Sequence, residues 1–229
     1  MVWGMAGTLP SFSLEKVRAA QLRLSKRVIR EDCLAENIQQ VAGVDSAYAG
    51  EDAIGAAVVL DFSTLSATEF AVACVRTRFP YVPTMLSLRE ISPTVCAIRK
   101  LRVKPDVFLV DGHGIAHPYR FGFASHLGIV LNSPTIGVAK SLLCGEVQPL
   151  NGGGLALIVD RGETIGMAVT TVLGRKPVYV SIGHKVSLEK AVQIVMRCVK
   201  DHRIPEPIRR AHIIANAEKK TRGTYNVGV

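Results

Sequence analysis

The chain has 229 residues, and its 28 Lys and Arg residues against 19 Asp and Glu residues give a formal net charge of +9. With 48% hydrophobic residues and a mean hydropathy of +0.25, the composition excludes an intrinsically disordered chain. No uncharged apolar run approaches the roughly 20 residues that a membrane span needs, so we expect no membrane partner.

The amino-terminal half predicts a helix followed by three strands. Apolar residues at helical spacing predict a helix over residues 14–32, with Ser13 as its cap. Strand-like runs follow at 40–49, 54–60 and 69–78. Their short polar or glycine-containing connections favour antiparallel pairing.

The middle of the chain predicts a helix and a buried strand. A helical stretch covers about 84–102, and Ser92-Pro93 predicts a break in it, because serine caps helices and proline favours the first helical turn. Residues 106–111 form an apolar run typical of a strand that is buried on both faces.

The remaining elements alternate between helix and strand. We expect a helix over 121–132, strands at 134–140, 155–160, 164–172 and 178–184, a helix over 187–200, and a last helix from about Pro205 to about residue 220. This order predicts a single mixed-sheet α/β domain that covers residues 1–229.

The cysteine pattern indicates a reducing compartment. The five cysteines are odd in number, scattered and free of any CxxC pair, which argues against a disulfide framework and a zinc ribbon. The first residues lack a basic start followed by a long apolar segment, so a secretory signal is not expected. We therefore expect a cytoplasmic protein, and we expect a monomer.

The positive charge is concentrated in two segments. Residues 76–104 hold seven basic residues against Glu90 alone, a net of +6, and residues 197–229 have a net of +5. Two basic segments on a near-neutral body suggest a polyanionic partner, nucleic acid first. Charge alone is equally compatible with solvated helix faces.

Three acidic residues stand out by their positions. Asp45 lies inside an apolar strand, Asp111 closes another, and Glu90 lies on the helix between them. Two carboxylates about 4 Å apart repel by about 4 kcal/mol at an effective dielectric of about 20, and a divalent cation removes that cost. A single aspartate has the simpler explanation of ending a strand. The three together favour a site for Mg²⁺ or Mn²⁺.

The segment DGHGIAHP admits two interpretations. Asp111, His113 and His117 could be zinc ligands, but HxxxH aligns its ligands only on a helix, and the glycines favour a loop. In the alternative, glycine amides approach a flat ligand, while His117 or His126 binds a phosphate or orients a neighbouring group. A histidine with a purely structural role remains the simpler explanation for His113 and His126.

Two further residues have both a functional and a structural explanation. Lys140 follows a predicted strand and could face the same site, or it could be a surface lysine. Tyr81 lies between Pro80 and Pro83, which would hold its ring rigidly at a loop tip. The ring could stack on bases, or it could pack against the helix that follows.

Taken together, these segments resemble the endonuclease V family of inosine-directed DNA repair nucleases. The resemblance covers roughly residues 12–215. It rests on VAGVDSAY (41–48), PYVPTMLSLRE (80–90), DVFLVDGHGIAHPYRFGFASHLG (106–128), PTIGVAKSLLCG (134–145), SIGHKVSL (181–188) and IPEPIRRAH (204–212). Two positions depart from the family pattern: Thr84 replaces the usual Gly after PYxP, and Ile182 stands where many members have Pro.

The resemblance implies an RNase H-like mixed sheet flanked by helices, and it implies roles for particular residues. The catalytic residues would be Asp45, Glu90, Asp111, Lys140 and His212, with Asp45, Glu90 and Asp111 as metal ligands. Tyr81 would be a wedge that fills the space of an extruded base, with Pro80, Pro83, Arg89 and His117 also at the DNA. The base pocket would contain Leu86, Gly112, Gly114 and Leu142.

The activity that the resemblance implies is hydrolysis of DNA at deoxyinosine, with Mg²⁺ as cofactor and Mn²⁺ as a substitute. A water molecule would attack the phosphorus of the second phosphodiester bond 3′ of the lesion, leaving 3′-hydroxyl and 5′-phosphate ends. One alternative is a ribonuclease that acts on inosine in RNA. The others are a nucleic-acid-binding module without catalysis and a zinc hydrolase.

Overall fold

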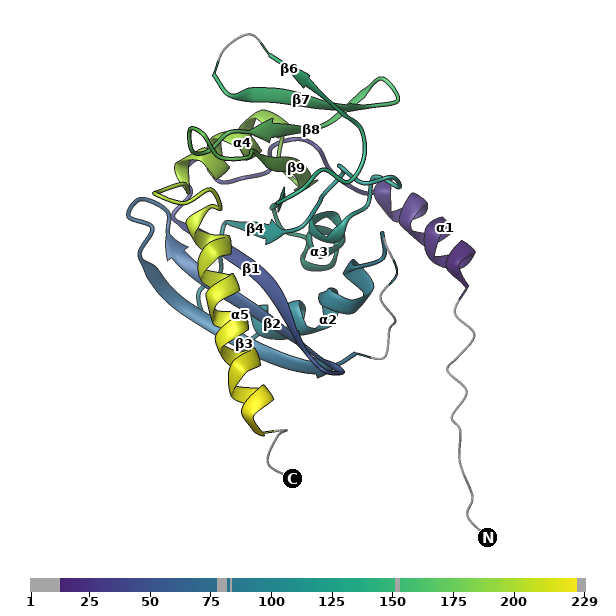
Figure 1. The fold of residues 1–229 in the computed structure, drawn as a ribbon. Helices are drawn as coiled ribbons and strands as arrows, with labels where there is room; N and C mark the ends of the chain where they lie inside the picture. Colours follow the sequence, from purple (N-terminus) through teal and green to yellow (C-terminus); the bar gives the residue numbers. More distant parts are fainter. Residues whose placement is uncertain (1–12, 78–81, 83, 151–152, 226–229) are drawn as a thin grey trace.

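The computed structural model describes residues 13–77, 82, 84–150 and 153–225. Over these residues the chain forms a nine-stranded mixed sheet in the order β3-β2-β1-β4-β5-β9-β8-β7-β6 (Figure 1). The strands of the first half are β1 (Gln40–Ala49), β2 (Asp52–Asp61), β3 (Ala67–Arg76), β4 (Val107–Asp111) and β5 (Thr135–Ala139). The strands of the second half are β6 (Glu146–Pro149), β7 (Leu155–Asp160), β8 (Glu163–Val169) and β9 (Val178–His184).

The direction of the strands agrees with the predicted fold class. β1, β2 and β3 form an antiparallel meander, and β1 continues in parallel into β4 and then β5. This arrangement of three antiparallel and two parallel strands is the RNase H-like sheet that the family resemblance implies. The second half, from β9 to β6, is antiparallel throughout.

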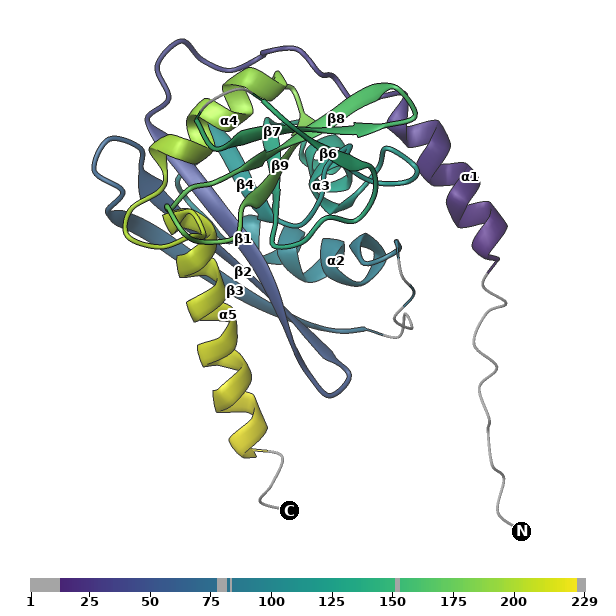
Figure 2. The same cartoon turned by 45° about the horizontal axis from the view of Figure 1, so that its top comes forward.

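Helices cover both faces of the sheet. One face carries α4 (Leu188–Arg197) and α5 (Glu206–Tyr225), and the other carries α2 (Ser87–Ile98) and α3 (Phe123–Leu131). The amino-terminal helix α1 (Leu14–Ser25) lies on the opposite side of the molecule from α5 in both views (Figures 1 and 2).

The alternation of side chains along the central strands creates two cores. On β4, Val107 and Leu109 belong to the core under α4 and α5, while Phe108 and Val110 belong to the core under α2 and α3. Because successive side chains of a strand point to opposite faces, Asp111 follows Leu109 onto the α5 face. The pattern that buries the sheet therefore also aims the acidic residue.

Two glycines allow helices to approach the sheet closely. A Cβ atom at Gly43 on β1 would overlap the carbonyl group of Pro207 in α5. A Cβ atom at Gly55 on β2 would overlap the backbone of Pro93 and Thr94 in α2. Both helices are therefore seated directly on the strands, and each carries a candidate site residue.

Several predicted bounds were wrong for identifiable reasons. The break at Ser92-Pro93 does not occur, because α2 runs continuously through Pro93, with its backbone packed on Gly55. The first helix ends at Ser25 rather than residue 32, although Ser13 caps it as predicted. The last helix extends to Tyr225, and the exposed edge strand β6 was not predicted.

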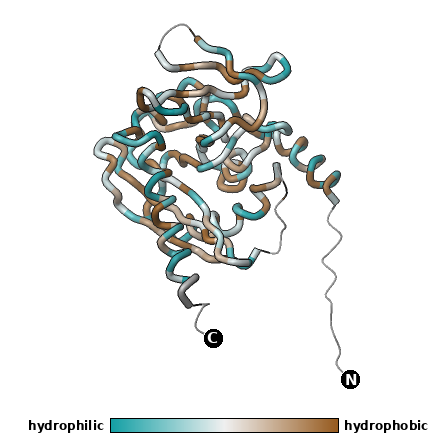
Figure 3. Tube along the Cα trace, in the orientation of Figure 1, coloured by the Kyte–Doolittle hydropathy of each residue, from teal (hydrophilic) through white to brown (hydrophobic). Residues whose placement is uncertain are grey.

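The hydropathy of the chain follows this architecture. Hydrophobic residues run along the central strands, whereas hydrophilic stretches alternate with hydrophobic ones along α5 (Figure 3). Among the described residues, no helix is long and apolar enough to cross a bilayer.

Candidate active site

The pairing of β1 with β4 brings two of the predicted acidic residues together. The last parallel pair in the register is Val44 with Val110, so Asp45 and Asp111 are the next residues on neighbouring strands. Both point to the α5 face by the alternation of side chains. Asp45 is buried, with 7% exposure, and Asp111 is partly buried.

His212 reaches the same point from α5. Its Nδ1 lies 2.7 Å from Oδ2 of Asp45. Pro207, which lies little more than one turn earlier on α5, packs closely on Gly43 of β1, and this contact brings His212 near Asp45. One ligand atom from each of Asp45, Asp111 and His212 lies within 4.8 Å of the others, and these three residues could hold a metal ion.

Lys140 lies beside the acidic pair. It follows β5, and its Nζ forms an ion pair with Oδ2 of Asp111. Its backbone is fixed from another direction, because Nη2 of Arg203 donates to the carbonyl oxygens of Lys140 and Pro177, each at 2.6 Å. Lys140 therefore lies beside the acidic residues, where the sequence suggested that it could be.

Glu90 approaches from the other face of the sheet. It belongs to α2, is only 7% exposed, and accepts a hydrogen bond of 3.1 Å from the hydroxyl of Tyr48. The guanidinium of Arg89 lies over the Tyr48 ring, 4.5 Å from its centroid. Glu90 is not a member of the close Asp45, Asp111 and His212 set, so its role as a metal ligand stays a prediction.

The electrostatics show the cost of this acidic cluster. Burial and then the charge of Asp111 raise the pKa of Asp45 to about 6. Burial is also the main cause that raises the pKa of Glu90 to about 8, with Asp45 and Asp111 adding to it against the Tyr48 hydrogen bond. The influence of both aspartates on Glu90 shows that the three carboxyl groups share one electrostatic environment.

A cavity of about 260 Å³ lies next to the acidic residues. Its walls come from the segment before α2, the loop after β4, the start of α3 and the segment after β5. The lining residues are Thr84, Leu86, Ser87, Gly112, His113, His117, Gly122, Phe123, Ser141 and Leu143. The volume is below the roughly 300–1,000 Å³ of drug-sized ligand pockets, which suits a small flat group.

His117 has a defined hydrogen-bonding state. The amide N–H of Tyr119 donates to Nδ1, at 3.2 Å, which leaves the hydrogen on Nε2 to donate to the carbonyl of Thr84, at 3.0 Å. Burial lowers the pKa of His117 to about 4, so the ring is neutral at neutral pH. His117 thus holds the carbonyl group of Thr84, and its role at the DNA stays a prediction.

The other two histidines of this region are also buried, and burial lowers the pKa of each. His113 lines the cavity, and His126 lies against Phe121 with ring centroids 5.4 Å apart. Among the described residues, the set that could hold a metal includes none of His113, His117 and His126. The zinc interpretation therefore finds no support in the geometry.

The four residues predicted for the base pocket are placed differently. Leu86 and Gly112 line the cavity, whereas Gly114 is pressed against the carbonyl of Ile182 on β9. Leu142 packs into a small core with Ala116, and Leu143 lines the cavity in its place.

The two departures from the family pattern have different consequences. Ile182 contributes its carbonyl oxygen to the amide of Ile115, at 2.8 Å, a contact that any residue type supplies. Thr84 adopts a left-handed backbone with φ of 69°, which glycine tolerates far better than threonine. Tyr81, Pro80 and Pro83 lie outside the described residues.

Sequence reasoning did not select Tyr48, Thr84 as a cavity residue, or Leu143. Tyr48 lies three residues after Asp45 on the same strand, and alternation alone places it on the α2 face with Glu90. For Thr84, its departure from the family pattern was the available signal. The segment after Lys140 offered a weaker one, since Ser141 and Leu143 follow the strand end directly.

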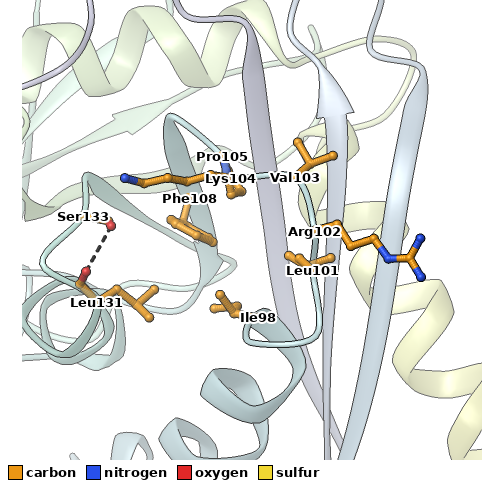
Figure 4. Close-up of a pocket in the computed structure, with 9 residues that line it drawn as sticks. All are labelled: Ile98, Leu101, Arg102, Val103, Lys104, Pro105, Phe108, Leu131 and Ser133. Atoms are coloured by element: carbon orange, nitrogen blue, oxygen red, sulfur yellow. Dashed lines mark hydrogen bonds between the residues drawn. The ribbon is translucent and has the colours of Figure 1, made fainter.

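A second cavity, of about 190 Å³, lies at the other end of β4 (Figure 4). It is lined mainly by apolar side chains such as Ile98, Leu101 and Phe108, and the guanidinium of Arg102 points away from it. Its described lining holds no acidic residue or histidine, so we do not assign the chemistry to it.

The basic segments are partly neutralised by local pairs. Glu206 accepts hydrogen bonds from Arg209 and Arg210, and Arg222 pairs with Glu218. The +5 segment at the carboxyl end is therefore partly engaged within α5 itself.

Comparisons with known proteins point to one family. The sequence model of the family described as endonuclease V matches residues 22–213. The endonuclease V of Thermofilum pendens is 49% identical over 208 residues, covering 90% of this chain and 89% of the relative. The crystal structure of the Streptomyces avermitilis endonuclease V has a TM-score of 0.85 at 38% identity, covering 92% of this chain and 94% of that one.

The third relative differs from the first two because its structure includes a nucleic acid. The Ciona intestinalis endonuclease V has a TM-score of 0.83 at 33% identity and covers 90% of this chain and 98% of its own. Its crystal structure is a complex with a 24mer DNA that contains an inosine followed by a ribo-adenosine.

Proposed function

Since the chain belongs to the endonuclease V family and is an endonuclease, we propose that it is a Mg²⁺-dependent DNA repair enzyme that acts at deoxyinosine. It hydrolyses the second phosphodiester bond 3′ of the lesion and leaves 3′-hydroxyl and 5′-phosphate ends. The observation that carries this proposal is the adjacency of the Asp45, Asp111 and His212 set to a small cavity.

The donor set fits a divalent cation. Two carboxylates and one imidazole converge within 4.8 Å, and carboxylate oxygens are preferred by Mg²⁺ and Mn²⁺. Asp45 bears a raised pKa because it is buried beside a second carboxyl group. A cation there would favour the ionised form of both aspartates, and Glu90 is a further ligand in this proposal.

The residues of the site have distinct tasks in hydrolysis. Bound Mg²⁺ supplies Lewis-acid stabilisation of the charge that develops on the phosphate oxygens. Asp45 orients the imidazole of His212 through Nδ1. Lys140, about half exposed beside Asp111, offers its ammonium group to the same phosphate. Water attacks the phosphorus in line and gives up a proton, the bond between phosphorus and the 3′ oxygen breaks, and the leaving 3′ oxygen takes up a proton, so no covalent link to the protein forms.

The cavity supports recognition of an extruded base. Extrusion costs a few kcal/mol and is easiest for a weakly paired lesion. Hypoxanthine lacks the 2-amino group of guanine, and a tight pocket that leaves this amine unpaired would reject guanine by roughly 1–3 kcal/mol. His113 lines the cavity with a buried Nδ1 that has no hydrogen-bond partner within the described structure.

We further propose that Tyr81 acts as the wedge, supported by Pro80 and Pro83, and that Arg89 contacts the strand. Tyr81→Ala should weaken binding to inosine-containing duplex more than binding to undamaged duplex, because a wedge acts only when a base is extruded. Equal losses on both duplexes would contradict the wedge role.

The decisive experiment uses a duplex with a single inosine, incubated with Mg²⁺ or with EDTA, and maps the cut to one nucleotide. Cleavage one nucleotide beyond the inosine's own 3′ phosphate, only with Mg²⁺, is expected. Cleavage that persists in EDTA, or that ignores the inosine, would refute the proposal. We also propose a monomeric, single-domain, cytoplasmic enzyme, and size-exclusion chromatography of residues 1–229 tests the monomeric state.

A second substrate deserves comparison because of one specific observation. Two Ciona intestinalis complexes contain an inosine followed by a ribo-adenosine. If this chain is an inosine-specific endoribonuclease, matched RNA should be cut faster than DNA of the same sequence. A parallel assay with DNA, RNA and a DNA strand with one ribonucleotide separates the two substrates.

A further inference from the structure

The junction between the 78–83 segment and α2 contains an unusual backbone conformation. Thr84 has a φ of 69°, and a β-branched residue in this left-handed region is a genuine outlier. Such conformations persist only where the surrounding structure over-determines them, and they cluster at ligand sites. Contacts from elsewhere in the chain must therefore hold Thr84 in this conformation.

Two side chains converge on the carbonyl oxygen of Thr84. Nε2 of Gln21, on α1, donates to it at 3.0 Å, and Nε2 of His117 lies at 3.0 Å from the same atom. Gln21 is the only residue of α1 that is buried. The two donors come from segments far apart in the sequence, and they fix the carbonyl from two directions.

The fixed residue belongs to the wall of the cavity. Thr84 and His117 both line the cavity, together with Gly112 and Phe123. A glycine at this position would adopt the same backbone without strain and would carry no side chain. The chain thus holds a bulkier residue in a glycine-type conformation at the cavity.

We propose that Thr84 is a specificity-determining residue that narrows the base cavity, and that Gln21 on α1 is a positioning residue that holds it there. This inference rests on the proposed function, because it assigns the cavity to the extruded base. It gives α1 a task in substrate selection through a single buried amide.

The first test compares cleavage at inosine with cleavage at guanine. Thr84→Gly should lower the ratio of kcat/KM for inosine over guanine about three- to tenfold, because the wall loses atoms that exclude the 2-amino group. The matched control is Arg161→Gly, which relieves a φ of 55° in the exposed β7–β8 turn and should leave the ratio unchanged. An unchanged ratio in Thr84→Gly would overturn the specificity role.

The second test asks whether Gln21 acts through Thr84. Gln21→Met should lower kcat/KM for inosine about two- to tenfold in the wild-type background, the usual range for one lost hydrogen bond. In the Thr84→Gly background the same change should cost less than about twofold, because glycine keeps the conformation unaided. Gln193→Met, at an exposed glutamine of α4, is the control. Equal losses in both backgrounds would show that Gln21 is merely structural.

A third measurement does not depend on cleavage. The amide of Met85 donates to the carbonyl of Val82 at 3.0 Å, so its hydrogen exchange reports the junction directly. Gln21→Met should speed this exchange in the wild-type background more than in the Thr84→Gly background. If wild-type protein ignores inosine, the proposed function fails while this result still decides the Gln21 contact. If inosine is cut and exchange is unaffected, the positioning role alone fails.

Discussion

The candidate metal site (Asp45, Asp111 and His212, called the metal set below) and the 260 Å³ cavity lie side by side, yet they are built differently. Asp45 lies within β1, Asp111 ends the neighbouring strand β4, and the sheet register places them together. The cavity is walled mainly by connecting segments, with Thr84, His117 and Leu143 as examples. In the proposed mechanism, cleavage therefore depends on residues held by regular structure, whereas base selection depends on connecting segments, whose conformations can vary more freely.

The largest expected effect falls on the metal set. Asp45→Asn or Asp111→Asn should reduce cleavage by more than about 100-fold, because even residues that only support metal ligands cost 10- to 100-fold when removed. DNA binding in the absence of metal should be largely kept. Cleavage and metal titrations by calorimetry check both statements, and full activity in either variant would remove the distinction between the two regions.

The second prediction concerns pH and the buried carboxyl groups. The raised pKa values of Glu90 (about 8) and Asp45 (about 6) mean that the folded, metal-free protein binds more protons than the unfolded chain between about pH 4 and pH 8. The free energy of unfolding should therefore fall as pH rises, by up to about 1.4 kcal/mol per pH unit per group, and should level off above about pH 8.

Urea denaturation in EDTA across this range measures the effect. Glu90→Gln should flatten the pH dependence, because an amide does not titrate, and added Mg²⁺ should restore stability most at the higher pH values. A wild-type curve parallel to that of Glu90→Gln would contradict the assignment.

The third prediction targets the seating of α5. Gly43→Ala should destabilise the fold by about 1–3 kcal/mol, because its new methyl group must displace the backbone at Pro207. Cleavage at saturating substrate should fall as well, since the shift moves His212 away from Asp45. Gly50→Ala, in an open turn with φ of 60°, is a useful contrast, because its strain should lower stability without altering activity.

The smallest effects separate two adjacent leucines. Leu142→Ala should cost about 1–3 kcal/mol of stability and little selectivity, because Leu142 packs in a small core. Leu143→Ala should change stability by less than about 0.5 kcal/mol, because Leu143 is 43% exposed, yet it should alter the preference for inosine. Thermal melts and cleavage ratios of both variants test this prediction. A loss of selectivity in Leu142→Ala and a loss of stability in Leu143→Ala would contradict it.

The same contrast explains what the sequence could predict. Apolar runs are enough to predict most of the strands, and the acidic residues in them single out Asp45 and Asp111, but the parallel register that joins β1 to β4 lies outside the local pattern. The position of Glu90 is harder, because it depends on how closely α2 packs on Gly55, which local pattern does not encode. The predicted break at Pro93 was wrong for the same reason, since tertiary packing outweighed a local preference.

Loop geometry was beyond local prediction. The exchange of Leu142 for Leu143 in the cavity is a shift of one residue, and nothing in the spacing around Lys140 decides which leucine turns inward. The left-handed Thr84 depends on Gln21, which lies 63 positions away in the sequence. Such long-range contacts become visible only once the fold is known.

Arg203 links the two halves of the sheet through hydrogen bonds. Its guanidinium ties the end of β5 to the start of β9, and its own carbonyl accepts a hydrogen bond from Thr171 beyond β8 at 2.7 Å. It also immediately precedes the segment that leads into α5. One side chain thus braces the backbone of Lys140 against strands that lie outside the metal set. The second half of the sheet therefore helps to position Lys140, and in the proposed mechanism a shift there would displace the ammonium group from the phosphate.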